Sequence, residues 1–301
     1  MSDQQIQLMH GECLELMALI PDGSVDAIIC DLPFGTTQNS WDVVIPFAPM
    51  WEAYNRVVKP NGAIVLNAAD PFTVDLISSN RKSFRYRWVW DKCRPTGFLN
   101  AEKQPLRVTE DICVFYARQC TFNPQKETRG RPRNKGLYNK PGGSDNYGAF
   151  NRQAARIRPH VPFRDAEPLA VGENGEGCLV IGAALSLVAP DEGRGQDRNT
   201  QAFNNVHFPT NILRFSNAAQ KGKLHTTQKP VALFEYLIQT YTNPGDLVLD
   251  NCMGSGTTAV ACIQSGRRFI GIEKDDKYFA VAAQRIRDTH RNLFFQEEAA
   301  L

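Results

Sequence analysis

The sequence lacks the features that would assign it to the membrane, secreted or zinc-binding classes. No apolar run reaches the roughly 18 residues that a membrane-spanning helix needs, and the polar first residues do not resemble a signal peptide. The eight cysteines form no C-x-x-C pair, so we expect reduced, mostly buried thiols and no metal site. We find no internal repeat. These absences lead us to expect a soluble protein of the cytoplasm.

The sequence also lacks a large excess of either sign of charge, since the net charge is only +2. The basic and acidic residues are nevertheless unevenly distributed along the chain. Between positions 118 and 158 there are ten basic residues and only two acidic ones, Glu127 and Asp145. Aromatic and asparagine side chains are interleaved with them, as on surfaces that bind phosphates and bases. A solvated loop rich in glycine and arginine is the alternative interpretation, and the two are compatible if the loop orders on DNA.

Apolar runs of strand length alternate with amphipathic helical segments at both ends of the chain. This pattern is typical of an α/β fold with a doubly wound, mostly parallel sheet. We expect seven strands, near residues 6–10, 25–30, 62–68, 86–92, 112–116, 247–251 and 268–273. The middle of the chain, 117–224, breaks the pattern with many glycines and polar residues, which favours an inserted module with long loops.

A first motif, Asp31–Phe34, follows the apolar run 25–30 at the junction of a strand and a loop. It offers a carboxylate, a carbonyl held in extended geometry by the next proline, and an aromatic face. Two acceptors and a ring suit the amino group of a flat base. In isolation, the same residues also fit an ordinary strand end with a turn aspartate and a core phenylalanine.

A second motif, 247–258, combines a strand, a glycine-rich turn and the start of a helix. Glycines allow close approach of a ligand, and free N–H groups at the helix start can face acceptor atoms. Glu273, at the end of the next strand, can accept both hydroxyls of a ribose. The spacing Gly254-x-Gly256-x-x-Ala259 also fits a nicotinamide dinucleotide site or a purely structural turn, whereas a P-loop would need a lysine here.

Together with the segment His225–Pro230, the two motifs resemble those of the amino-group DNA methyltransferases, specifically the β class. In that class the target-base motif comes first and the S-adenosylmethionine (AdoMet) motif last, a circularly permuted order that dinucleotide enzymes do not share. Members commonly have Asp-Pro-Pro-Tyr at Asp31–Phe34, His-Pro-Thr-Gln-Lys-Pro at 225–230, and Pro-Phe at 251–252. The resemblance covers roughly 6–116 and 208–292.

The resemblance implies a Rossmann-like catalytic domain made of 1–116 and 225–301, with 117–224 as an inserted target-recognition module. It implies that the Asp31 carboxylate and the Leu32 carbonyl hold the target amino group, with Pro33 aiming that carbonyl. Phe34 would stack on the flipped base. The implied AdoMet site comprises Glu12, Thr227, Gln228, Lys229, Asp250, Asn251, Cys252, Gly254, Ser255, Gly256, Thr257 and Glu273. Candidate contacts to the DNA backbone are Lys103, Arg107, Arg129, Arg131, Arg133 and Lys135.

Topology connects the two motifs, because ligands in doubly wound sheets lie beyond the carboxyl ends of strands where the strand order reverses. If strands 25–30 and 247–251 are neighbours, Asp31 and the glycine turn face one crevice. The leading hypothesis is sequence-specific methylation of adenine N6 in duplex DNA by AdoMet.

Methylation of cytosine N4 needs the same two acceptors, and Asp31 favours adenine only by resemblance. A catalytically silent DNA-binding homologue, a nicotinamide enzyme, and RNA or a protein amide as the substrate are further alternatives. The resemblance also makes a homodimer and a cognate restriction endonuclease candidate partners.

Overall fold

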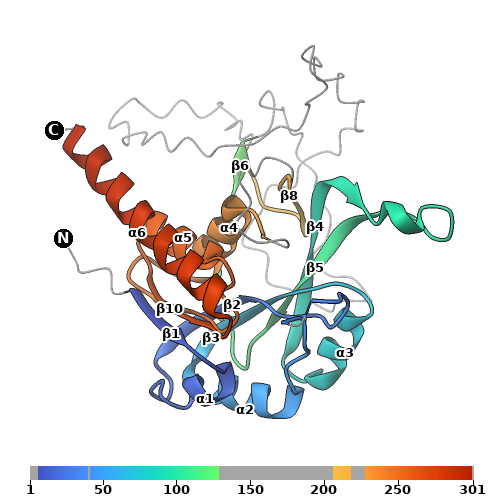
Figure 1. Ribbon diagram of the computed structural model, residues 1–301, viewed down its shortest axis with the longest axis horizontal. Coiled ribbons are helices and arrows are strands. Elements are labelled where there is room, and N and C mark those ends of the chain that lie inside the picture. The colour runs from blue at the N-terminus through green and yellow to red at the C-terminus, as the bar shows by residue number, and fades with distance from the viewer. Residues whose placement is uncertain (1–5, 40, 129–205, 218–227, 300–301) are drawn as a thin grey trace, which may run out of the picture. The chain divides into compact units, whose positions relative to one another are not determined.

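The computed structural model describes residues 6–39, 41–128, 206–217 and 228–299 of the chain (Figure 1). Internal contacts divide the chain into two units, 1–125 with 210–301, and 126–209. The described part of the second unit contains a short antiparallel pair, β6 (Glu127–Thr128) with β7 (Val206–His207). None of the described helices combines the length and the apolar composition needed to cross a membrane.

The first unit is built around an eight-stranded sheet with the order β1-β10-β9-β2-β3-β5-β4-β8. The strands are β1 (Ile6–His10), β2 (Val25–Asp31), β3 (Val58–Ala68), β4 (Phe84–Thr96), β5 (Arg107–Phe115), β8 (Ile212–Arg214), β9 (Leu247–Asp250) and β10 (Arg268–Glu273). Only β5 runs against its neighbours β3 and β4; the other pairings are parallel. The predicted doubly wound, mostly parallel sheet is therefore confirmed.

The predicted number of seven strands is wrong, because β8 adds an eighth at the edge of the sheet next to β4. This strand has three residues, of which only Leu213 is buried. A three-residue segment is too short to show an alternation of apolar and polar residues. Its strand conformation depends on pairing with β4.

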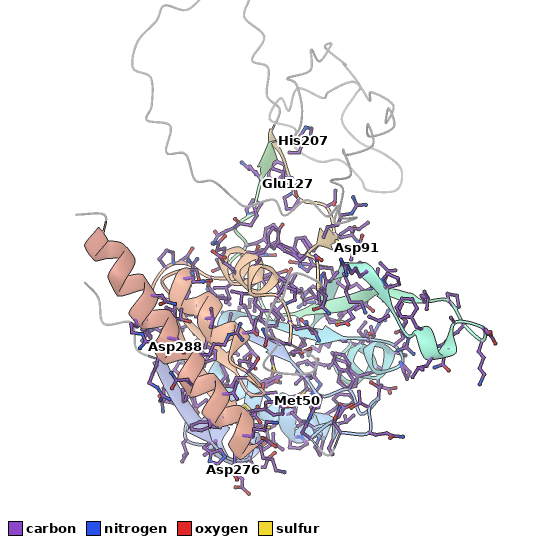
Figure 2. All side chains as sticks on the ribbon, turned by 45° about the horizontal axis from the view of Figure 1, so that its top comes forward. Met50, Asp91, Glu127, His207, Asp276 and Asp288 are labelled. Atoms are coloured by element: carbon purple, nitrogen blue, oxygen red, sulfur yellow. The ribbon has the colours of Figure 1, made fainter. Side chains whose placement is uncertain are left out.

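Helices cover both faces of the sheet. They are α1 (Cys13–Met17), α2 (Phe47–Val57), α3 (Phe72–Ser79), α4 (Val231–Tyr241), α5 (Thr257–Gln264) and α6 (Asp276–Ala299), with a short 3-10 helix η1 (Phe98–Asn100). The helices α4, α5 and α6 pack on one face, and α1, α2 and α3 on the other. Met50 of α2, labelled in Figure 2, is fully buried in the second layer. The sheet is therefore packed on each face against an apolar core.

The strands β2 and β9 are direct neighbours, as Ala27 pairs with Val248 and Ile28 with Leu249. They run parallel, so their carboxyl ends lie at the same edge of the sheet. The Asp31–Phe34 motif and the glycine turn that follows β9 therefore meet at this edge, as the topology argument predicted, although they lie far apart in the sequence.

Candidate active site

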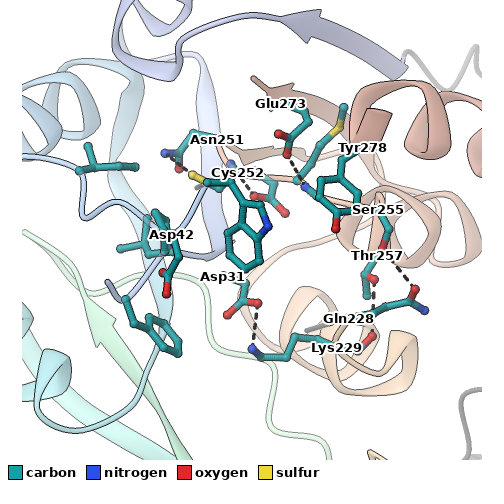
Figure 3. Close-up of a pocket in the computed structure, with 18 of the residues that line it drawn as sticks. Asp31, Asp42, Gln228, Lys229, Asn251, Cys252, Ser255, Thr257, Glu273 and Tyr278 are labelled. Atoms are coloured by element: carbon teal, nitrogen blue, oxygen red, sulfur yellow. Dashed lines mark hydrogen bonds and ion pairs between the residues drawn. The ribbon is translucent and has the colours of Figure 1, made fainter. Parts of the chain in front are cut away.

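A cavity of about 760 Å³ opens at the carboxyl edge of the parallel strands (Figure 3). The first motif and the glycine turn line the same cavity. The predicted site residues in its wall are Glu12, Asp31, Leu32, Pro33, Phe34, Arg107, Gln228, Lys229, Asp250, Asn251, Cys252, Gly254, Ser255, Thr257 and Glu273. Thr227, Arg129, Arg131, Arg133 and Lys135 lie outside the described residues.

Gly256, which was also predicted to belong to the AdoMet site, packs against α6 and does not line the cavity. It precedes α5 with a φ of +76°, and a Cβ atom there would lie 3.2 Å from the Cβ of Ala282 on α6. From the same helix, the Arg285 guanidinium donates to the Ser255 carbonyl at 3.0 Å and to Thr257 Oγ1 at 3.1 Å. Burial lowers the pKa of Arg285. The turn is thus held from behind by α6.

The carboxylate of Asp250 and the amide of Asn251 hold the turn from the other side. Asp250 accepts from the Thr258 hydroxyl and, at 3.1 Å, from the Cys252 N–H. Burial raises the pKa of Asp250 to about 6, although these hydrogen bonds oppose the rise. Tyr54 of α2 donates to Asn251 Oδ1 at 2.7 Å. These contacts make the turn a rigid wall of the cavity.

Two further carboxylates in the cavity wall lie at the ends of β10 and β1. Glu273 accepts from the N–H groups of Gly254 at 2.9 Å and of Asp275 at 2.8 Å. Glu12 caps α1 by accepting from the Leu14 N–H at 2.7 Å. A carboxylate has about four acceptor positions, so both retain capacity for ligand hydroxyl or amino groups.

On the opposite wall, the ring of Phe34 stacks on that of Phe72, with centroids 5.3 Å apart and planes at 28°. The loop after Phe34 is organised by Asp42, which accepts from the backbone N–H groups of residues 35–37 at 2.8, 3.0 and 2.7 Å. Burial alone would raise the pKa of Asp42, but its hydrogen bonds with Thr37 and the backbone lower it. This loop forms a fixed border of the cavity.

Asp31 belongs to a chain of buried ion pairs. Its Oδ2 lies 2.9 Å from Lys229 Nζ (Figure 3). Lys229 Nζ is also 3.4 Å from Glu110 Oε2, and Glu110 Oε1 lies 3.2 Å from Lys92 Nζ. Asp31 Oδ1 is buried and accepts no hydrogen bond from the described residues. Burial raises the pKa of Asp31, and the ammonium of Lys229 opposes this effect. One carboxylate oxygen is therefore engaged and the other is available.

A family model described as DNA methylase matches residues 25–284. The chain belongs to the N6/N4 DNA methylase family. DNA adenine methyltransferase YhdJ of Escherichia coli (strain K12) is 39% identical over 296 residues, and the match covers 93% of this methylase and 82% of that protein.

Two solved structures are similar to this methylase. The M1.HpyAVI–SAM complex matches with a TM-score of 0.52 and 23% identity, over 93% of this chain and 100% of that chain. The cytosine-N4-specific PvuII DNA methyltransferase matches with a TM-score of 0.55 and 16% identity, over 96% of this chain and 93% of that chain. Both share the fold of the methylase.

The solved structure of M1.HpyAVI is a complex with SAM, that is AdoMet, the cofactor that the order of the motifs predicts for this methylase. The residues in the cavity fit this molecule. Glu273 and Glu12 supply acceptors for hydroxyl and amino groups, and the glycine turn supplies a rigid backbone wall. A cavity of about 760 Å³ also falls within the range of roughly 300–1,000 Å³ that small-molecule sites occupy.

The residues of the cavity wall that were not predicted from the sequence include Glu110, Lys92 and Asp42. Because β5 runs antiparallel to β3, its first residues lie at the edge where the parallel strands end, which places Glu110 there. A sheet assumed to be parallel would put Glu110 at the opposite edge. Lys229 was expected beside the carboxylate of AdoMet, but in the structure its ammonium lies against Asp31 and Glu110.

Proposed function

We propose that the methylase transfers the methyl group of AdoMet to N6 of an adenine that has been rotated out of duplex DNA. The observation that carries this proposal is the buried Oδ1 of Asp31, which has no hydrogen-bond donor among the described residues and lies in a cavity shared with the glycine turn. A buried acceptor without a donor is costly unless a ligand completes it. The amino group of a nucleobase is the donor that this acceptor suits.

The target amine is a poor nucleophile because its lone pair is delocalised into the ring. Asp31 Oδ1 and the Leu32 carbonyl can each accept one of its two hydrogens, which orients the nitrogen and favours a pyramidal geometry. Bound AdoMet supplies an electrophilic methyl carbon on a sulfonium. As the bond from nitrogen to carbon forms, the bond from sulfur to carbon breaks, and Asp31 Oδ1 can take the proton that the amine must lose.

On the base side, Phe34 offers a ring face for stacking, since the contact with Phe72 covers its other side. On the cofactor side, we assign the ribose hydroxyls to Glu273 and the adenine of AdoMet to Glu12. Gln228, which interacts with Ser255 at 3.3 Å, lies at the turn where the methionine part is expected.

The hairpin between β4 and β5 is the described element best suited to contact the DNA backbone. Figure 1 shows it projecting from the body of the first unit, and it carries the exposed side chains of Arg94, Lys103 and Arg107. Arg107 also lines the cavity, so DNA that delivers a base to the cavity would pass this hairpin. Target recognition by 117–224, a homodimer and a partner endonuclease stay predictions.

Cytosine N4 methylation is the second candidate, because the acceptors at Asp31 and Leu32 satisfy any exocyclic amino group. We favour adenine because the relative YhdJ is named a DNA adenine methyltransferase at 39% identity.

Mass spectrometry of nucleosides from DNA incubated with the methylase and AdoMet tests the proposal. We expect N6-methyladenine with the wild type and with the control Asp22→Ala, whose carboxylate is 77% exposed. Asp31→Ala should give none. N4-methylcytosine would move the assignment to the second candidate. DNA binding without methylation by either protein would indicate a silent homologue.

A further inference from the structure

A row of charged side chains from three strands lies beneath the start of α4. Asp31, Glu110 and Lys92 each lie two positions along their strand from an apolar side chain buried beneath α4, and residues two apart in a strand share a face. Lys229, two residues before Val231 at the start of α4, lies between the two carboxylates. Segments that are distant in the sequence thus form one cluster.

The cluster alternates in sign, in the order Asp31, Lys229, Glu110, Lys92, and its formal charge is zero. The side chains of Lys229 and Lys92 are only 8% and 5% exposed, and that of Glu110 is 17% exposed. Buried ammonium groups are costly unless they are paired, and removing one partner leaves a charge uncompensated. The position of each member therefore depends on the next one along the row.

We propose that Lys229 is a positioning residue for Asp31. Its ammonium fixes the carboxylate by Oδ2 so that Oδ1 faces the amino group of the base, and Glu110, anchored by Lys92, sets the position of that ammonium. This inference rests on the role proposed above for Asp31.

The surroundings of the ammonium support this assignment. Lys229 Nζ lies 5.6 Å from the centroid of the Phe34 ring and 6.0 Å from that of Trp90, distances at which aromatic faces attract a cation. Two carboxylates and two rings thus restrict where Nζ can lie. A carboxylate that is tethered by one oxygen presents the other in a defined direction, and such alignment is what a near-attack geometry requires.

The charges that face Asp31 predict opposite effects for two substitutions. The ammonium of Lys229 favours ionised Asp31, whereas Glu110 on β5 and Asp42 in the loop after β2 disfavour it. Asp250 on β9 is a further carboxylate near Asp31. Because Asp31 must be ionised to take the proton that the amine loses, activity should fall as pH drops through the pKa of Asp31. Loss of Lys229 should raise that pKa, and loss of Glu110 should lower it.

The test is the pH dependence of kcat for Lys229→Gln and Glu110→Gln, with Km values for AdoMet and DNA. We expect Lys229→Gln to lower kcat about 10- to 100-fold and to shift the acid limb upward by about 1–3 pH units. Glu110→Gln should shift the acid limb downward by about one pH unit. The matched control is Lys59→Gln, which breaks an ion pair with Asp26 near the other end of β2 and should leave the profile unchanged.

Several outcomes would overturn the proposal. If Lys229→Gln weakens AdoMet binding and leaves the acid limb unshifted, the ammonium of Lys229 binds the carboxylate of AdoMet instead of positioning Asp31. Shifts of the same sign in both variants would also refute it. If Lys229→Gln does not fold, the Glu110→Gln variant tests the proposal by itself. A downward shift of its acid limb would support the proposal, and no downward shift would refute it. An active Asp31→Ala variant would instead refute the proposed role of Asp31, so the two failures are distinguishable.

Discussion

Substitution of Gly256 by alanine should weaken both the fold and the binding of AdoMet. A φ of +76° is left-handed, and an L-residue there costs about 1–2 kcal/mol. The added Cβ would also lie 3.2 Å from the Cβ of Ala282, so α6 must move by a few tenths of an ångström. That movement would shift Arg285, which holds the carbonyl of Ser255 in the cavity wall.

The matched control is Gly245→Ala, because Gly245 has a φ of +85° but a Cβ there meets none of the described residues within 4 Å. It carries the backbone strain without the clash. We expect Gly245→Ala to lose about 1–2 kcal/mol in urea unfolding and Gly256→Ala to lose more, and only Gly256→Ala to lose about tenfold in AdoMet affinity by titration calorimetry. If Gly256→Ala binds AdoMet as tightly as Gly245→Ala does, the role assigned to this contact is wrong.

Three further predictions follow from the site. AdoMet at about 100 times its Kd should stabilise the fold by about 2.7 kcal/mol in thermal melting, and NAD should not; the reverse would favour a nicotinamide enzyme. Asp42→Ala removes the acceptor of three backbone N–H groups and should lower kcat on DNA while the AdoMet Kd stays unchanged. Equal losses in kcat and in AdoMet affinity would argue that the loop after Phe34 does not border the base side of the cavity. Because burial raises the pKa of Asp250 to about 6, its contribution to stability is greatest below its unfolded value and is lost as pH rises through about 6. The wild type should therefore lose roughly 2–3 kcal/mol relative to Asp250→Asn between pH 4 and 7 in urea unfolding, and parallel curves would contradict this.

The parts of the fold that are encoded locally could be predicted from the sequence. The apolar runs and the glycine turn predicted the class of sheet. The two motifs were predicted to line one cavity, and they do so because β2 and β9 are neighbours. The strand β8 was missed because its three residues depend on pairing with β4.

Other features of the site depend on tertiary packing and could not be predicted. The antiparallel direction of β5 brings Glu110 to the site, and the position of the Lys229 ammonium depends on that carboxylate. The close contact of Gly256 with Ala282 could not be predicted either, because Ala282 lies on a helix that follows later in the chain. The interaction partner of a side chain on another element leaves no local pattern in the sequence.

The most direct test is a crystal structure of the methylase with a non-reactive AdoMet analogue and duplex DNA that contains its site. The target amine should lie within about 3.2 Å of both Asp31 Oδ1 and the Leu32 carbonyl oxygen, and about 3–3.5 Å from the position of the transferred methyl. A target base held away from Asp31, or an analogue bound in a cleft that the glycine turn does not line, would contradict the account.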